Sequence, residues 1–130
     1  MTQEQKDLLI KDLCGRLTHG VKCKILETNE VKILGAIQYD GENTLFDFWE
    51  DDQKIQYAYQ LYLSEFKPCL LPISSMTKEQ IKEFNSITQK CSTYIGKSIL
   101  LTDFCNKHHI DWRGLIPMGL AIDATGLNIY

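Results

Sequence analysis

The alternation of apolar and polar residues over positions 21–73 is the main pattern in this chain. Apolar side chains recur there at every second position, as in Val21, Cys23 and Ile25, with lysines between them. This period of two is typical of half-buried strands, and the Asp-Gly dipeptide at 40–41 is a strong hairpin signal. We therefore predict five antiparallel strands, at residues 21–25, 31–39, 44–49, 55–63 and 69–73.

Two residues in this region indicate how the strands are arranged. Gly35 lies in the middle of the second strand, where a missing side chain predicts a bend or bulge. Pro72 lies in the last strand, which fits the edge of a sheet because proline has no backbone N–H to donate. Five short strands with one bend are typical of a small SH3-like barrel or a curled sheet, in which closure removes exposed edges.

Helical patterns lie on both sides of this β-rich region. Thr2 with Gln5 forms a capping box before a helix predicted over residues 3–14, and Thr77 with Gln80 forms another before a helix that reaches about residue 91. Further on, the prediction is a loop at 92–98, a helix at 99–107, one turn at 112–116 capped by Asp111, and coil at 118–130.

The sequence therefore predicts one α+β domain over residues 1–130. Its β-rich core spans residues 21–73, and its helical cap comprises residues 1–20 and 77–130, with one N-terminal helix and two to three C-terminal helices. A chain of 130 residues is long enough to bury a core without disulfides or metals. The five cysteines contain no CxxC pair and are expected to be free thiols.

Composition narrows the function classes. The formal net charge of -3 argues against a general nucleic-acid binder, which needs a basic surface to neutralise phosphates. No apolar run approaches the ~20 residues that span a bilayer, and residues after Met1 do not resemble a signal peptide. We therefore expect a cytoplasmic protein without a membrane partner; no pattern indicates a cofactor, a metal or an oligomeric state.

An acidic and aromatic stretch is the most informative candidate surface. Residues 40–52 contain six acids and no lysine or arginine, and aromatic residues are interleaved with them. Aromatic residues are common in protein interfaces, although most large aromatics are buried in cores. The predicted protein-binding surface comprises Asp40, Glu42, Phe46, Phe48, Trp49, Glu50, Asp51 and Asp52.

Three alternative sites remain open from the residues alone. His108, Asp111 and Arg113 contain a possible base, its orienting carboxylate and an anion-binding group, as in a small hydrolase or nuclease. The same residues are also natural helix-end caps and ion-pair partners. Cys105 and His108 supply half of a zinc site, and no second ligand pair is evident.

Nucleic-acid binding by the barrel is the third alternative. It requires a basic stripe, and the available residues are Lys22, Lys24, Lys32 and Lys54. These lysines form such a stripe only if they share one face of the sheet.

Three segments are distinctive: 11–23 (KDLCGRLTHGVKC), 67–80 (KPCLLPISSMTKEQ) and 108–130 (HHIDWRGLIPMGLAIDATGLNIY), about fifty residues in all. Together they resemble a family of small uncharacterised proteins encoded by phages and prophages of gut bacteria. The resemblance implies an accessory role in phage biology and carries no activity. We therefore expect a non-enzymatic protein that binds a host or phage protein, with mimicry of nucleic-acid phosphates by the acids of 40–52 as a sharper variant.

Overall fold

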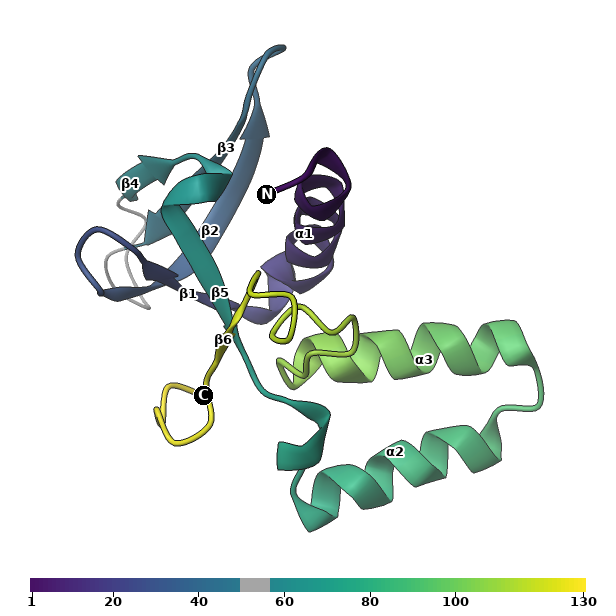
Figure 1. Ribbon diagram of the computed structural model, residues 1–130. Helices are drawn as coiled ribbons and strands as arrows, with labels where there is room; N and C mark the ends of the chain where they lie inside the picture. Colours follow the sequence, from purple (N-terminus) through teal and green to yellow (C-terminus); the bar gives the residue numbers. More distant parts are fainter. Residues whose placement is uncertain (50–56) are drawn as a thin grey trace.

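The chain folds into a twisted sheet with one helix against it and a helical hairpin that projects from one end (Figure 1). This computed structural model describes residues 1–49 and 57–130, and only the backbone of 57–59. The strands are β1 (Lys22–Ile25), β2 (Val31–Tyr39), β3 (Thr44–Trp49), β4 (Tyr57–Leu61), β5 (Phe66–Leu70) and β6 (Ile122–Asp123). The helices are α1 (Gln3–Arg16), α2 (Lys78–Lys90) and α3 (Tyr94–Lys107), and short 3-10 turns lie at Leu17–His19, Leu63–Glu65 and Ile73–Ser75.

The predicted α+β class is confirmed, and the predicted closure into a barrel is wrong. The sheet has the order β4-β3-β2-β1-β5-β6, and no pairing in the described part of the chain joins β4 to β6. All neighbours are antiparallel except β5 and β6, which run parallel. The sheet stays open because β5 already has a neighbour on each side, β1 and β6. The expected edge strand at 69–73 is therefore an inner strand at Phe66–Leu70, and Pro72 lies beyond its end.

The period-two pattern places the buried face of β1 correctly but not that of β2, where Leu34 is the buried residue and Val31 and Tyr39 are exposed. In β1, Cys23 and Ile25 are buried while Lys22 and Lys24 are half-buried. The predicted irregularity at Gly35 is also present, because the β2–β3 register shifts between its two neighbours. A β-bulge of this kind bends the strand and increases its twist.

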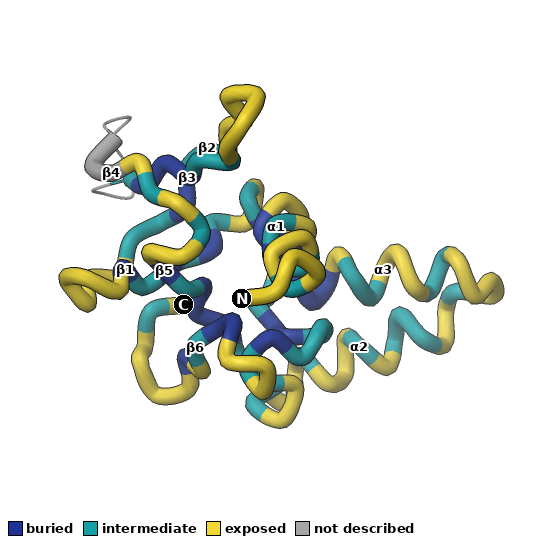
Figure 2. The backbone as a smooth tube through the Cα atoms, turned by 45° about the horizontal axis from the view of Figure 1, so that its top comes forward, coloured by how far each residue is buried: buried dark blue, intermediate teal, exposed yellow. Residues whose placement is uncertain are grey.

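The main core lies between α1 and the sheet, where the buried residues gather in Figure 2. It includes Leu9 and Leu13 from α1, Leu34 from β2 and Phe66 from β5. A second, smaller cluster of Phe104, Cys105 and Ile110 lies at the base of α3. In contrast, the outer parts of α2 and α3 are half-buried or exposed (Figure 2).

Capping explains where the helices begin. Both predicted capping boxes are present: the Thr2 and Thr77 hydroxyls each accept from the backbone N–H three residues on, and Gln5 and Gln80 reciprocate. The predicted loop at 92–98 is partly wrong, because α3 begins at Tyr94 with Thr93 as its N-cap. No helix in the described part of the chain is long and apolar enough to span a membrane.

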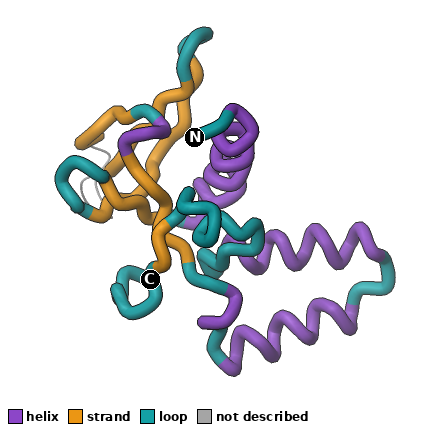
Figure 3. The backbone as a smooth tube through the Cα atoms, viewed as in Figure 1, coloured by secondary structure: helices purple, strands orange, loops and turns teal. Residues whose placement is uncertain are grey.

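The C-terminal segment is more ordered than the predicted coil (Figure 3). Its strand β6 pairs with Cys69 and Leu70 of β5, and Ala124 N–H donates to the Leu70 carbonyl at 2.8 Å. Beyond it, the Tyr130 hydroxyl donates to the Cys69 carbonyl at 2.7 Å and accepts from Lys22 N–H at 2.9 Å. The tail thus follows the outer side of β5 and returns to β1.

Candidate functional site

The two phenylalanines of the predicted binding surface belong to the core. Phe46 and Phe48 are both fully buried and pack edge-on against Phe66, with ring centroids 5.1 and 4.8 Å apart. They lie on the sheet face covered by α1, because their register partners Ile37 and Leu34 also pack there. Neither ring is available to a partner, so this part of the predicted surface is wrong.

Trp49 lies across the bulge in β2. A Cβ atom added to Gly35 would be only 1.2 Å from Nε1 of the Trp49 indole. The indole therefore occupies the space that a side chain at position 35 would fill, and Trp49 is half-buried. Because Gly35 has no side chain, the strand forms a bulge there and the Trp49 indole can lie directly over the backbone.

The acids of the predicted surface have separate roles. Asp40 and Glu42 are exposed in the β2–β3 turn, where the Asp40 carboxylate accepts from the N–H groups of Glu42 and Asn43. These hydrogen bonds, first that of Asn43, lower the pKa of Asp40. Asp47 is buried, and its carboxylate accepts from the side-chain amides of Gln38 and Gln60. Glu50, Asp51 and Asp52 lie outside the described residues.

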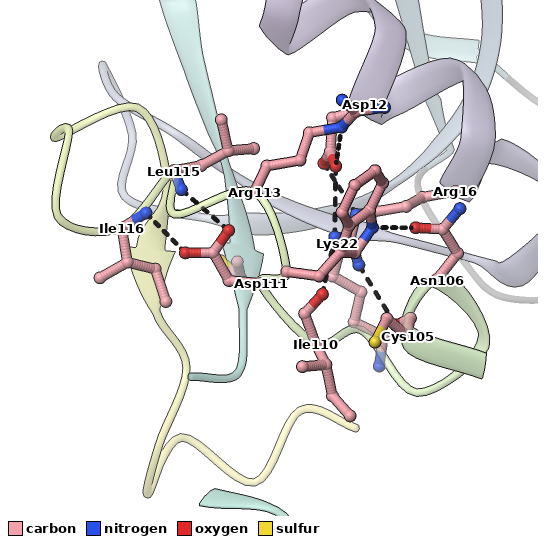
Figure 4. A network of polar contacts seen from close by, with 12 residues as sticks. Asp12, Arg16, Lys22, Cys105, Asn106, Ile110, Asp111, Arg113, Leu115 and Ile116 are labelled. Carbon is pink, nitrogen blue, oxygen red and sulfur yellow. Dashed lines mark hydrogen bonds and ion pairs between the residues drawn. The ribbon is translucent and has the colours of Figure 1, made fainter. Parts of the chain in front are cut away.

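The three residues of the hydrolase alternative contact different partners, as Figure 4 shows for Asp111 and Arg113. The Asp111 carboxylate accepts from the N–H groups of Leu115 and Ile116 at 2.8 and 2.9 Å. The predicted helical turn at 112–116 is wrong, because no helix forms there, and Asp111 instead holds the turn that begins at Leu115. Arg113 Nε lies 3.3 Å from the Asp12 carboxylate. His108 Nε2 lies 3.6 Å from Glu83. These three side chains therefore do not converge on one point, as general-base chemistry would require.

A buried charge network ties α1 to the segment after α3 (Figure 4). Arg16 is fully buried and holds Asp12 through two contacts of 2.7 and 3.2 Å. Its guanidinium also donates to the Ile110 carbonyl at 2.7 Å and to the Cys105 carbonyl at 3.4 Å. Arg113 approaches Asp12 from the other side. Asp12 and the two carbonyls satisfy the Arg16 guanidinium, so this part of the network positions chain segments. Arg113 Nε, by contrast, is buried near Asp12 without a hydrogen-bond partner.

The same group of residues also fixes the side chain of Trp112. The Trp112 indole N–H donates to the Asn106 amide oxygen at 3.0 Å, and the Arg113 guanidinium lies 4.1 Å from the Trp112 ring. Asn106 in turn lies against α1 at Gly15, where an added Cβ would be 2.9 Å from the amide nitrogen. Trp112 is thereby fixed at the base of α2 and α3.

The metal and nucleic-acid alternatives gain no support from the arrangement. In the described part of the chain, no group of three or more His, Cys, Asp or Glu side chains could hold a metal ion. Lys22 and Lys24 share one face of the sheet, whereas Lys32 pairs with the buried Cys23 and therefore projects toward the other face. Lys54 lies outside the described residues. The three candidate lysines that the structure describes, Lys22, Lys24 and Lys32, therefore do not all share one face.

The α2–α3 arm, residues 78–107, presents the largest apolar side chains at the surface. Between residues 71 and 103 no residue is buried. On α3, the exposed fractions are 85% for Tyr94, 73% for Ile95, 56% for Ile99 and 47% for Leu100. At 3.6 residues per turn these four positions span more than half of the helix circumference. Helices that are apolar on most sides are normally buried.

Comparison with known proteins identifies no relative. No protein-family model matches the chain, and neither a curated protein nor a solved structure matches it. Function must therefore be argued from the site itself.

Proposed function

We propose that this is a non-enzymatic binding protein whose α2–α3 arm contacts a protein partner. The observation that carries the proposal is the exposure of apolar side chains around the outer turns of α3, within residues 71–103, where no residue is buried. Large apolar side chains exposed together on one helix are candidates for an interaction site. The resemblance to phage and prophage proteins suggests a host or phage protein as the partner, met in the host cytoplasm.

The energetics favour a partner that covers α3. Full burial of a large aliphatic or aromatic side chain contributes about 1.5–3 kcal/mol. Tyr94, Ile95, Ile99 and Leu100 are exposed to different degrees, so covering them would contribute roughly 4–8 kcal/mol before the cost of association. Exposed apolar residues scattered over the whole surface would not contribute this free energy, because a single partner could not cover all of them.

The β2–β3 turn is the second candidate surface. Asp40 and Glu42 are exposed there beside Tyr39, which is 71% exposed. An acidic turn with an exposed ring retains the chemistry of the predicted surface, including phosphate mimicry, although without the two buried phenylalanines. The arm is the better candidate because its apolar surface is larger.

Double substitution on the arm tests the proposal. Ile95→Lys/Ile99→Lys replaces two exposed apolar side chains, so it should leave folding intact and abolish capture of a specific partner from host or infected-cell lysate. Gln89→Lys/Ser92→Lys is the matched control, since it adds the same charge at exposed polar positions of the arm. A partner that is captured equally by all three proteins would contradict a role for the arm.

The same capture experiment separates the second surface. Asp40→Lys/Glu42→Lys and a charge reversal at Glu50, Asp51 and Asp52 should leave arm-dependent capture unchanged. Loss of the partner with these variants, and not with the arm variant, would assign binding to the acidic hairpin instead. Sedimentation of each variant shows whether the captured partner is a second copy of the chain.

A further inference from the structure

A cavity of about 330 Å³ lies where the α2–α3 arm meets the body of the molecule. Met76 and Phe84 contribute from the start of the arm, Leu101 and Cys105 from α3, and Ile110 and Trp112 from the segment after α3. The exposed Tyr94, Ile95, Ile99 and Leu100 do not line it. The cavity is therefore separate from the apolar surface that the arm presents to a partner.

The lining determines the charge of any ligand. None of its side chains is charged, so an ion would lose hydration there without gaining a counter-charge. Burial raises the pKa of the Cys105 thiol, which keeps it in the neutral form. An uncharged ligand is the class that this lining accepts.

Two hydroxyl groups determine the polarity of the ligand. Ser98 Oγ donates to the Tyr94 carbonyl at 3.0 Å, and Thr102 Oγ1 donates to the Ser98 carbonyl at 2.8 Å. Each hydroxyl hydrogen is thus already used, and the oxygen lone pairs remain as acceptors. A ligand that carries one N–H or O–H donor fits this arrangement better than one that carries only acceptors.

The cavity is of a useful size and has a fixed wall. An apolar cavity of about 150 Å³ accommodates benzene, so about 330 Å³ accommodates roughly a dozen non-hydrogen atoms. Trp112 is fixed by its hydrogen bond to Asn106 and by the Arg113 guanidinium beside its ring, which is itself paired with Asp12. Pre-formed walls of this kind reduce the ordering cost of binding.

We propose that this cavity is a binding site for a small, uncharged aromatic molecule of about two fused rings with one hydrogen-bond donor. The ligand's rings lie among Phe84, Leu101 and Trp112, and its donor points to the hydroxyl oxygens of Ser98 and Thr102. The buried charge network thereby acquires a second role, since it positions the aromatic wall of the site. The proposal is independent of the protein partner of the arm.

Indole is a suitable probe, because it has two fused rings, one N–H donor and no charge. Titration of the full-length 15N-labelled protein with indole should give saturable chemical-shift changes at residues 101–112, with a Kd on the order of 0.1–1 mM for a fragment of this size. Indole-3-acetate, which adds a carboxylate to the same rings, should bind at least tenfold more weakly.

A matched pair of variants tests the location of binding. Ser98 is exposed at the rim of the cavity, so Ser98→Phe should fill it without disturbing the core and should weaken indole binding at least tenfold. Ser86→Phe places the same ring on the opposite side of the arm, where Ser86 lines a different groove, and should bind indole as the wild type does.

Three results would overturn the proposal. They are shifts that do not saturate and spread over the arm, equal binding of indole and its carboxylate analogue, and equal weakening by both phenylalanine variants. Loss of partner capture by the arm variants does not bear on any of them.

Discussion

His109 illustrates how position alters the chemistry of one residue. Its ring stacks on Tyr130 at a centroid distance of 3.7 Å, and its Nδ1 atom is buried without a hydrogen-bond partner. Burial first, and then the positive charges of Arg16, His19, His108 and Lys22, lower the pKa of His109 to about 4. The neutral ring is therefore the form that the fold accepts.

This lowered pKa predicts a specific pH dependence of stability. Between pH 6.5 and 4 the unfolded chain binds the extra proton at His109 and the folded chain does not, so stability is full above about pH 6.5 and falls as the pH falls. Because the ring is only partly buried, we expect a loss of roughly 1–2 kcal/mol from this residue. Urea unfolding at pH 7 and at pH 4.5 measures it.

His109→Asn should remove that component, since asparagine tolerates the positive φ of 59° found at this position. His19→Asn, at an exposed position, is the control and should retain most of the wild-type pH dependence. If His109→Asn loses as much stability on acidification as the wild type, the proton is bound elsewhere.

At the residue scale, the sequence predicted what depends on local geometry. The capping boxes of α1 and α2 and the irregularity at Gly35 follow from the chemistry of single side chains and their neighbours. The buried pair Asp12 and Arg16 was missed, although its signal was present. Asp12 is three residues after Leu9, and Arg16 is three after Leu13, so both charges share the buried stripe of α1. The carbonyls to which Arg16 donates, about ninety residues away, leave no trace in sequence spacing.

The elements differ in how completely they are covered. α1 and α3 both have 14 residues, yet α1 buries four residues along its length and α3 buries Phe104, Cys105 and Asn106 at its base. Local burial is what resists local opening of a helix. The outer turns of the arm should therefore open more easily than the rest of the molecule.

Hydrogen exchange tests this difference within one molecule. At low protein concentration, amides of residues 84–100 should exchange on the order of 100-fold faster than amides in the middle of α1 and in β5. A bound partner should slow exchange in the arm and leave α1 unchanged. If the amides of α1 and of the arm were equally protected from exchange in the isolated protein, the outer turns of the arm would not open more easily than α1.

The sequence predicted the start of a helix where a capping box is present, as in α1 and α2. It did not predict the start of α3, which follows α2 after a short connection. Thr2 and Thr77 are followed by glutamine at the capping position, and both helices begin where expected. Gly96 suggested a loop, but it lies in the first turn of α3, where an added Cβ would be 2.6 Å from Cys91 Sγ. The glycine is required by the close approach of the preceding link, a contact that propensity alone does not indicate.

For the whole molecule, Arg16 is a residue that connects the N-terminal helix α1 to the end of α3 and the segment after it. It joins α1 to the carbonyls of residues 105 and 110, so its removal should affect global stability rather than one helix. Arg16→Met leaves the Asp12 carboxylate buried with only Arg113 beside it, and breaking a buried pair in this way costs about 3–5 kcal/mol. Urea unfolding measures the change.

Arg113→Met provides the comparison, because the Arg113 side chain is 23% exposed and its contact with Asp12 is longer, at 3.3 Å. We expect a cost of about 1 kcal/mol for it. The double variant Asp12→Leu/Arg16→Met should recover part of the loss by removing both charges. A cost below about 1 kcal/mol for Arg16→Met would show that the network does not link α1 to the end of α3 and the segment after it.

The topology of the whole molecule was the hardest feature to predict. Alternation identified the strands of the meander and the buried face of β1, whereas the bulge at Gly35 interrupts the period in β2, where Leu34 is the buried residue. It could not show that residues 122–123 would pair in parallel with β5, since the two segments are some fifty residues apart and the later one is too short to show a period. That single pairing is what separates an open sheet from a closed barrel.

The late position of β6 in the chain affects how the protein matures on the ribosome. When residues 1–75 have emerged, β5 can already pair with β1, but its other backbone edge stays uncovered until residues 122–130 follow. During that interval β5 is an exposed edge strand of the nascent sheet, and such an edge can pair with another chain and cause aggregation. Slow elongation over residues 76–121 should therefore reduce soluble yield.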